Sequence, residues 1–184
     1  NKEHILISIA AGISIQYIRN KIEERCNVVR VMPNTPALIG EGLIAMCKEH
    51  KLQEREKKMV LKILSSLGKV EEVEEKQISA VTGISGSSPA YVYMFIEALA
   101  DGGVMMGLPR DQAYRIASQA VLGAAKMVLE SKEHPGVLKD MVCSPSGTTI
   151  EAVYALEQKC FRGTIMEAVK RCAEKEKAMY MKGE

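Results

Sequence analysis

The sequence predicts two kinds of structure in one chain, an α/β layer over the first third and an all-helical part after it. Up to about residue 74, short apolar runs alternate with helically spaced apolar residues, an order typical of strands covered by helices. From about Gln77 onward, the helical pattern continues almost without interruption. We therefore expect one domain over residues 1–74 and a second over residues 75–184.

The elements of the first domain follow from local spacing. The opening apolar run ends in small residues, and a later valine-rich run is stopped by Pro33. Between these runs, Ile15, Ile18 and Ile22 recur at the spacing of a helix face. We expect strands over residues 4–10, 26–32, 43–47 and 69–73, and helices over residues 14–24 and 52–67.

The second domain is predicted to be helical throughout. Its first long helix follows a Gly/Ser turn and carries Pro89 in its first turn, the position that proline prefers. Since so small a unit would struggle to cover its own apolar surface, we expect an obligate homodimer. Small residues suited to close helix contact are Ala98, Gly102, Ala120, Gly123 and Ala124. The expected helices span residues 89–103, 111–131, 136–142, 149–157 and 161–181.

Composition argues against several classes of protein. The 184 residues are 47% hydrophobic with a net charge of +2, so no electrostatic case exists for a nucleic-acid partner. No apolar run approaches the ~20 residues that a membrane span needs, and the charged residues 1–4 do not begin a signal peptide. The five cysteines are widely spaced and form no C-x-x-C pair. They indicate reduced thiols in a cytoplasmic protein, without disulfides or a metal site.

The most informative segment is residues 135–152, which packs small hydroxyl and glycine residues into a loop that opens directly onto a helix. Backbone N–H groups at a helix N-terminus are unpaired and the helix dipole is positive there, so such a loop can hold a carboxylate or phosphate. Ser144 and Thr149 would add hydroxyl donors. The alternative is a plain helix cap, because Ser/Thr/Gly loops commonly precede amphipathic helices.

The spacing of this segment resembles the signature of the Δ1-pyrroline-5-carboxylate reductases, with Ser146 in place of a glycine. Residues 32–36, 80–91 and 98–109 resemble the same family in the family's order, so the resemblance covers nearly the whole chain. It implies the C-terminal half of a Rossmann-type domain followed by an all-helical dimerisation domain. It also implies hydride transfer from NADPH or NADH to the C=N bond of 1-pyrroline-5-carboxylate, which yields L-proline.

The resemblance assigns substrate-binding roles to five residues. Ser144, Gly147, Thr148 and Thr149 would hold the ring carboxylate of the substrate. Glu75 matches an acidic position that lies near the substrate in the family, although in so acidic a segment it also fits a plain surface carboxylate.

The catalytic candidate is Thr82, whose hydroxyl would hydrogen-bond near the imine nitrogen or the nicotinamide. Its alternative is a turn residue that bonds its own backbone. Ligands of α/β sheets lie beyond the carboxyl ends of strands, which favours a group of cofactor contacts after the first two strands. For Asn34, between two prolines, the alternative is a turn residue. The expected cofactor-binding residues are Ala10, Ala11, Gly12, Asn34 and Thr35.

Two positions receive weaker assignments. Met141 departs from relatives that can carry a polar residue able to reach the cofactor, so we expect no firm contact there. His134 precedes Pro135 at a helix start, and we interpret it as a cap or surface residue rather than a general acid.

The Gly-rich strand, turn and helix that cradle a dinucleotide pyrophosphate are not found ahead of Ile5, so the chain looks truncated and we expect it to be inactive alone. The G-x-G-x-x-A string at residues 40–45 leads into an apolar run, so a turn before an edge strand is the better interpretation. Both NADPH and NADH stay open, because the residue that reads the ribose 2′ position would precede Asn1.

Two other classes of function remain. A non-catalytic oligomerisation module would use the helical part alone. Another imine or β-hydroxyacid reductase would share the architecture, but those enzymes generally offer a catalytic lysine on the long central helix. Residues 91–101 contain no lysine.

Overall fold

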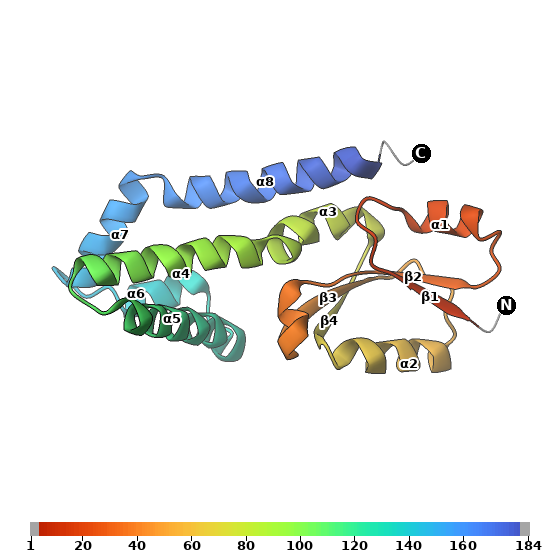
Figure 1. Cartoon of the computed structure of the whole chain (residues 1–184), viewed down its shortest axis with the longest axis horizontal. Coiled ribbons are helices and arrows are strands. Elements are labelled where there is room, and N and C mark those ends of the chain that lie inside the picture. Colours follow the sequence, from red (N-terminus) through yellow and green to blue (C-terminus); the bar gives the residue numbers. More distant parts are fainter. Residues whose placement is uncertain (1–3, 181–184) are drawn as a thin grey trace. The chain divides into compact units, whose positions relative to one another are not determined.

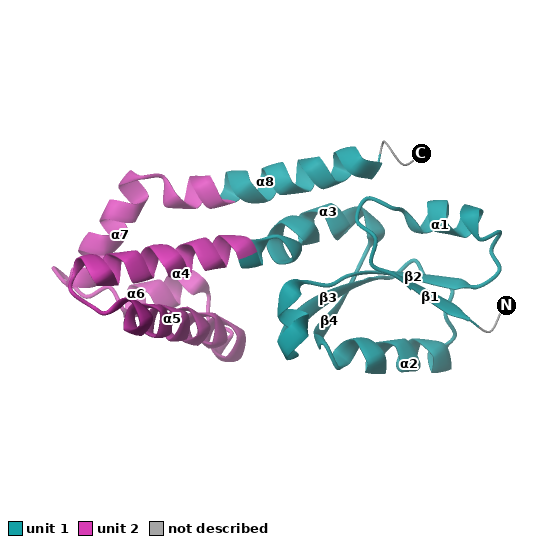
Figure 2. Cartoon of the chain, in the orientation of Figure 1, with its two compact units in different colours: residues 1–89, 166–184 teal, residues 90–165 magenta. Residues whose placement is uncertain are grey.

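The computed structural model describes residues 4–180 and divides into two compact units, each of which is described by itself (Figures 1 and 2). Unit 1 comprises Asn1–Pro89 and Met166–Glu184, and unit 2 comprises Ala90–Ile165. The domain boundary expected at residue 74 falls within unit 1 and stays a prediction. The expected end of the last helix at Met181 lies outside the described residues.

A mixed sheet of four strands forms the centre of unit 1, in the order β1-β2-β3-β4. The strand β1 (Ile5–Ser8) runs parallel to β2 (Asn27–Met32), and β3 (Gly42–Cys47) runs parallel to β4 (Gly68–Val73), while β2 and β3 are antiparallel. All four expected strands are therefore present. The expectation of an edge strand after residues 40–42 is wrong, because β3 lies between β2 and β4 and is buried on both faces.

Helices cover both faces of this sheet (Figure 1). The helix α2 (Glu54–Ser65) packs Val60 and Leu64 against one face, and α1 (Ile15–Lys21) packs Ile15 against the other. Local capping starts both helices: the Ser14 hydroxyl accepts a hydrogen bond from the backbone N–H of Tyr17 at 3.0 Å, and α2 begins with a capping box.

After β4 the chain stays helical where we expected a Gly/Ser turn. The short η2 (Glu75–Gln77) and α3 (Ile78–Val81) lead into a π-helical turn, η3 (Thr82–Gly86), and then into α4 (Ser88–Met105). The π turn closes with a hydrogen bond from the Ser87 N–H to the Thr82 carbonyl at 2.8 Å. A β-carbon added to Gly83 would lie 2.7 Å from the Val169 carbonyl oxygen, and one added to Gly86 would lie 3.0 Å from Met32 Cε, so both glycines allow close packing. π turns recur at functional sites.

Unit 2 is helical, as expected, and the side chains buried at its centre are small. It contains most of α4, then α5 (Arg110–Ser131), α6 (Pro135–Met141) and α7 (Thr148–Gln158), and the first residues of α8 (Phe161–Tyr180). Its cluster of buried residues consists of alanines: Ala100, Ala113 and Ala117. Within residues 4–180, none of the helices has both the length and the apolar character that crossing a membrane requires.

Candidate functional site

The predicted anion loop forms a tight turn directly before α7. The Gly147 N–H donates to the Ser144 carbonyl at 3.0 Å, and Ser146 has a left-handed backbone with φ of 54°. Ser146 occupies the position where the resembled pattern carries glycine, the residue that adopts this conformation most easily. A side chain on Gly147 would overlap the Ser144 hydroxyl. The turn thus explains why small residues occupy this segment.

The donors of this loop remain available. Gly147 is the N-cap of α7 and has no side chain that could accept from the first N–H groups of the helix, so those groups have no side-chain cap. Within residues 4–180, the hydroxyl groups of Ser144, Thr148 and Thr149 make no hydrogen bond, while the exposed Glu151 is the acidic residue of the first helical turn. Backbone N–H groups and hydroxyls together form an arrangement that can accept a small carboxylate.

His134 is a helix cap, as we expected. Its Nδ1 accepts a hydrogen bond from the Gly136 N–H at 3.0 Å at the start of α6. Met141 is exposed near the end of the same helix.

The predicted cofactor residues lie at one edge of the sheet in unit 1. Because β1 and β2 are parallel neighbours, the loops that follow them leave the sheet at the same edge. Ala10, Ala11 and Thr35 are exposed there. Gly12 is buried with φ of 70°, and a β-carbon on it would lie 2.7 Å from the Met179 Cβ. Gly12 therefore serves the close approach of α8.

Asn34 is more than a turn residue. Its Nδ2 donates to the Ser85 carbonyl at 3.2 Å and to the Ser85 hydroxyl at 3.3 Å, and its Oδ1 accepts from the Leu43 N–H at 2.9 Å. These three bonds use both ends of the amide. The side chain thereby joins the loop after β2 to β3 and to the π turn that begins at Thr82.

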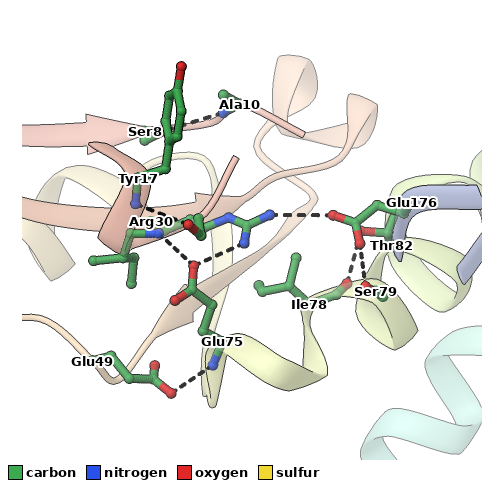
Figure 3. A network of polar contacts seen from close by, with 12 residues as sticks. Ser8, Ala10, Tyr17, Arg30, Glu49, Glu75, Ile78, Ser79, Thr82 and Glu176 are labelled. Atoms are coloured by element: carbon green, nitrogen blue, oxygen red, sulfur yellow. Dashed lines mark hydrogen bonds and ion pairs between the residues drawn. The ribbon is translucent and has the colours of Figure 1, made fainter. Parts of the chain in front are cut away.

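A buried charged network, which sequence analysis missed, connects the remaining candidates (Figure 3). Arg30 of β2 is 1% exposed, and its guanidinium reaches Glu75 at 3.1 Å and Glu176 of α8 at 3.3 Å. The Arg30 guanidinium also stacks over the Tyr180 ring at 4.7 Å. An arginine within the valine run of β2 was the signal available in the sequence, because an unpaired charge is expensive inside a sheet.

Glu75 belongs to this network, so the interpretation as a plain surface carboxylate is wrong. Its side chain is 24% exposed, and its Oε1 accepts from the Arg30 guanidinium and from the Ile15 N–H at 2.7 Å. The carboxylate therefore also stabilises the N-terminus of α1, where the helix dipole favours negative charge.

Thr82 is buried in the helical segment, and its hydroxyl donates to the Ile78 carbonyl at 2.9 Å. This bond matches the alternative of a residue that bonds its own backbone, although in a helix rather than a turn. It fixes the direction of the hydroxyl proton and leaves the oxygen able to accept a hydrogen bond.

Burial weakens the acidity of two groups in unit 1. Desolvation raises the pKa of the Tyr180 phenol to about 12, although the nearby Arg30 charge opposes the shift. Desolvation likewise raises the pKa of the Cys47 thiol in β3 to about 12. A thiol with such a pKa is unreactive at neutral pH. All five cysteines are free thiols, as expected.

Among residues 4–180, no group of His, Cys, Asp and Glu side chains is arranged to hold a metal ion.

Comparison with known proteins gives a consistent result. A family described as pyrroline-5-carboxylate reductase dimerisation matches residues 75–179. The chain is 49% identical to the pyrroline-5-carboxylate reductase of Escherichia coli over 175 residues, which are 95% of this chain and 65% of that protein. It is 46% identical to the Pisum sativum enzyme over 178 residues, 97% of this chain and 65% of the relative. The chain thus spans less than two thirds of the length of these relatives.

Solved structures of pyrroline-5-carboxylate reductases resemble the fold of this chain. A crystal structure of Plasmodium falciparum pyrroline carboxylate reductase with NADP bound superposes with a TM-score of 0.89 at 40% identity, covering 96% of this chain and 71% of that one. The reductase of Coxiella burnetii superposes with a TM-score of 0.88 at 31% identity, covering 95% and 65%.

Proposed function

Because this chain belongs to the pyrroline-5-carboxylate reductase family, we propose that the protein containing it reduces the C=N bond of 1-pyrroline-5-carboxylate with NADPH or NADH to give L-proline. The observation that carries the proposal is the loop before α7: its N–H groups have no side-chain cap, and its three hydroxyls make no hydrogen bond in the described part of the chain, residues 4–180, so the loop is suited to the ring carboxylate. A carboxylate gains more from such charge-assisted hydrogen bonds than a neutral group does.

The ring carboxylate is held by Ser144, Gly147, Thr148 and Thr149. The hydroxyls and the N–H groups at the start of α7 belong to one short segment, so they can bind and orient the anion together, while the Gly147 N–H holds the turn by donating to the Ser144 carbonyl. Orientation matters because hydride transfer requires the two reacting carbons to approach to about 3–3.5 Å.

Thr82 acts at the imine nitrogen. Since its hydroxyl proton is committed to the Ile78 carbonyl, its oxygen lone pairs are left to accept the N–H of a protonated imine. That hydrogen bond keeps the proton on nitrogen while the C=N carbon accepts the hydride, so the product nitrogen carries the proton it already had. Thr82 does not transfer a proton in this scheme.

The reduced nicotinamide supplies the hydride from its C4 when bound. The sheet edge of unit 1 fits such a group, because Ala10, Ala11 and Thr35 expose small side chains and backbone beyond the ends of β1 and β2. Gly12 and Asn34 contribute by holding the shape of these loops, since Gly12 is buried and the Asn34 amide is fully bonded.

The helical part forms a homodimer or a larger oligomer of the same chain. Its buried cluster contains three alanines, whereas many large apolar side chains are exposed. Examples on α4 and α5 are Tyr93, Met94, Met105, Leu122 and Leu129. Burying each such side chain contributes about 1.5–3 kcal/mol, which favours a second copy as the cover. This surface also supports oligomerisation as a function of the helical part in its own right.

A cytoplasmic location is supported by the five free thiols, because oxidising compartments favour disulfides.

The test is a steady-state assay of the complete protein with 1-pyrroline-5-carboxylate and either NADPH or NADH. We expect consumption of the reduced cofactor that depends on the imine and an equal amount of L-proline, identified by mass spectrometry. A reaction without the imine is the control. Absence of proline with both cofactors would refute the proposed activity.

A further inference from the structure

One face of α8 packs along the segment that carries Thr82. Glu176 accepts a hydrogen bond from the Ser79 hydroxyl, and the Cys172 sulfur lies 3.0 Å from the Ser87 hydroxyl. Gly83 approaches α8 so closely that a β-carbon on it would lie 2.7 Å from the Val169 carbonyl oxygen. The contacts therefore extend over α3 and the whole π turn.

Glu176 is the charged centre of this contact. It is 3% exposed, and its two carboxylate oxygens are divided between two elements: Oε1 faces Arg30 of β2, and Oε2 faces Ser79 of α3 (Figure 3). A carboxylate buried to this degree is stable only when both oxygens are satisfied. Its two partners are therefore held at a fixed separation.

We propose that Glu176 is a positioning residue for the reduction, because its carboxylate ties Ser79 to Arg30 and thereby sets where the Thr82 oxygen lies relative to the sheet edge. Ser79 directly follows Ile78, whose carbonyl accepts the Thr82 hydroxyl proton. A shift of Ser79 therefore moves the group that orients Thr82. This inference rests on the proposed function, in which Thr82 meets the imine nitrogen.

The geometry favours positioning over stability alone. When Glu176 is removed, Arg30 keeps Glu75 as an ion-pair partner. The Ser79 hydroxyl, in contrast, makes no hydrogen bond within residues 4–180 other than the one to Glu176. The link to α3 thus depends on Glu176. A misplacement of about 1 Å in a reacting group can lower a rate about a hundredfold, so even a small shift is measurable.

The experiment compares three variants of the complete protein. Ser79→Ala removes only the link to α3 and leaves the Arg30–Glu176 ion pair in place. Glu176→Gln keeps the side-chain size and removes the charge. Glu174→Gln is the matched control, because Glu174 is exposed on the same helix and its ion pair with Lys170 is long, at 4.0 Å.

We expect kcat to fall about five- to fiftyfold in Ser79→Ala and in Glu176→Gln, with little change in the KM for the dinucleotide. The loss in the double variant should be smaller than the product of the two single effects, because the two substitutions act at successive contacts of one path from Arg30 through Glu176 to Ser79. Glu174→Gln should match the wild type. If Ser79→Ala retains full kcat, or if Glu176→Gln lowers only the melting temperature, Glu176 is merely structural and the inference is wrong.

Hydrogen exchange separates this inference from the proposed activity. The Ser87 amide closes the π turn on the Thr82 carbonyl, so its exchange rate reports the order of that turn. We expect faster exchange in Ser79→Ala and Glu176→Gln than in Glu174→Gln. Unchanged exchange in both variants would overturn the positioning role even if the wild type proved inactive, whereas an inactive wild type with altered exchange would overturn only the proposed function.

Discussion

The side chain of Asn34 holds Ser85 by two hydrogen bonds, one to its carbonyl and one to its hydroxyl. Asn34 follows β2, and Ser85 lies in the π turn 51 residues later. The same amide accepts the Leu43 N–H, so one side chain fixes three segments. The stretch between Pro33 and Pro36 therefore carries a structural clamp beside the expected cofactor edge.

Replacement of Asn34 by alanine should destabilise the protein substantially. It leaves the Leu43 N–H and the Ser85 carbonyl without their partner, and each part-buried group left unsatisfied costs about 1–3 kcal/mol. We expect a loss of about 2–4 kcal/mol in urea unfolding. Asn20→Ala is the control, because the exposed Asn20 side chain bonds only the Gln16 side chain within residues 4–180. Equal effects of the two substitutions would show that the clamp contributes nothing.

Two glycines allow the contact with α8 to be isolated. Gly12 and Gly40 have nearly the same φ, 70° and 76°, but a β-carbon on Gly12 meets Met179, whereas Gly40 has open space around it. Gly40→Ala should cost about 1–2 kcal/mol from the left-handed backbone alone. Gly12→Ala should cost about 1–3 kcal/mol more, from overpacking. Melting curves of both variants measure the two losses of stability. Equal losses would mean that α8 shifts to accommodate the added methyl group at no cost in stability.

Substitution of Thr149 tests the carboxylate site in the complete enzyme. A hydrogen bond to a charged group contributes about 1.5–3 kcal/mol, so Thr149→Ala should lower kcat/KM about ten- to a hundredfold. Since the Thr149 hydroxyl makes no hydrogen bond within residues 4–180, the melting temperature should barely change. Unchanged kinetics with a loss of about 1 kcal/mol of stability would instead identify a helix cap.

The helical part should dimerise. Sedimentation of the protein at micromolar concentration should give twice the mass of one chain, because large side chains such as Met105 and Leu129 are exposed around a buried cluster of three alanines. A well-folded monomer that persists at this concentration would contradict the proposed interface.

The buried Cys47 thiol predicts a loss of stability at alkaline pH. Its pKa rises from 9.0 to about 12 on folding, so the folded state retains its proton after the unfolded state has lost it. The contribution of the Cys47 thiol to the free energy of unfolding is fully present below pH 9. It declines as the pH rises toward 12, by up to about 1.4 kcal/mol per pH unit.

Cys47→Ala removes this titration, so its stability should fall less steeply with pH than that of the wild type between pH 9 and 11. Denaturant unfolding at several pH values measures the two slopes. Tyr180 titrates in the same direction in both proteins and does not affect their difference. Parallel slopes would show that the thiol ionises equally in both states.

The sequence by itself determined most of the helices and strands and the local caps and turns. Helical spacing, the Ser14 cap and the small-residue turn before α7 depend on interactions between residues a few positions apart. The neighbouring sequence therefore contains all the groups that form them. The same holds for His134, whose cap depends on a residue two positions away. Family membership also followed from four short motifs in order.

The tertiary structure decided which groups meet. Arg30 and Glu176 are 146 residues apart, and nothing in the spacing of either predicts the other. The same is true of β3, which the sequence suggested as an edge strand and which pairing placed between β2 and β4. Ion pairs and strand neighbours depend on chain segments that only folding brings together, and a buried charge gains its stability from partners that local sequence does not contain.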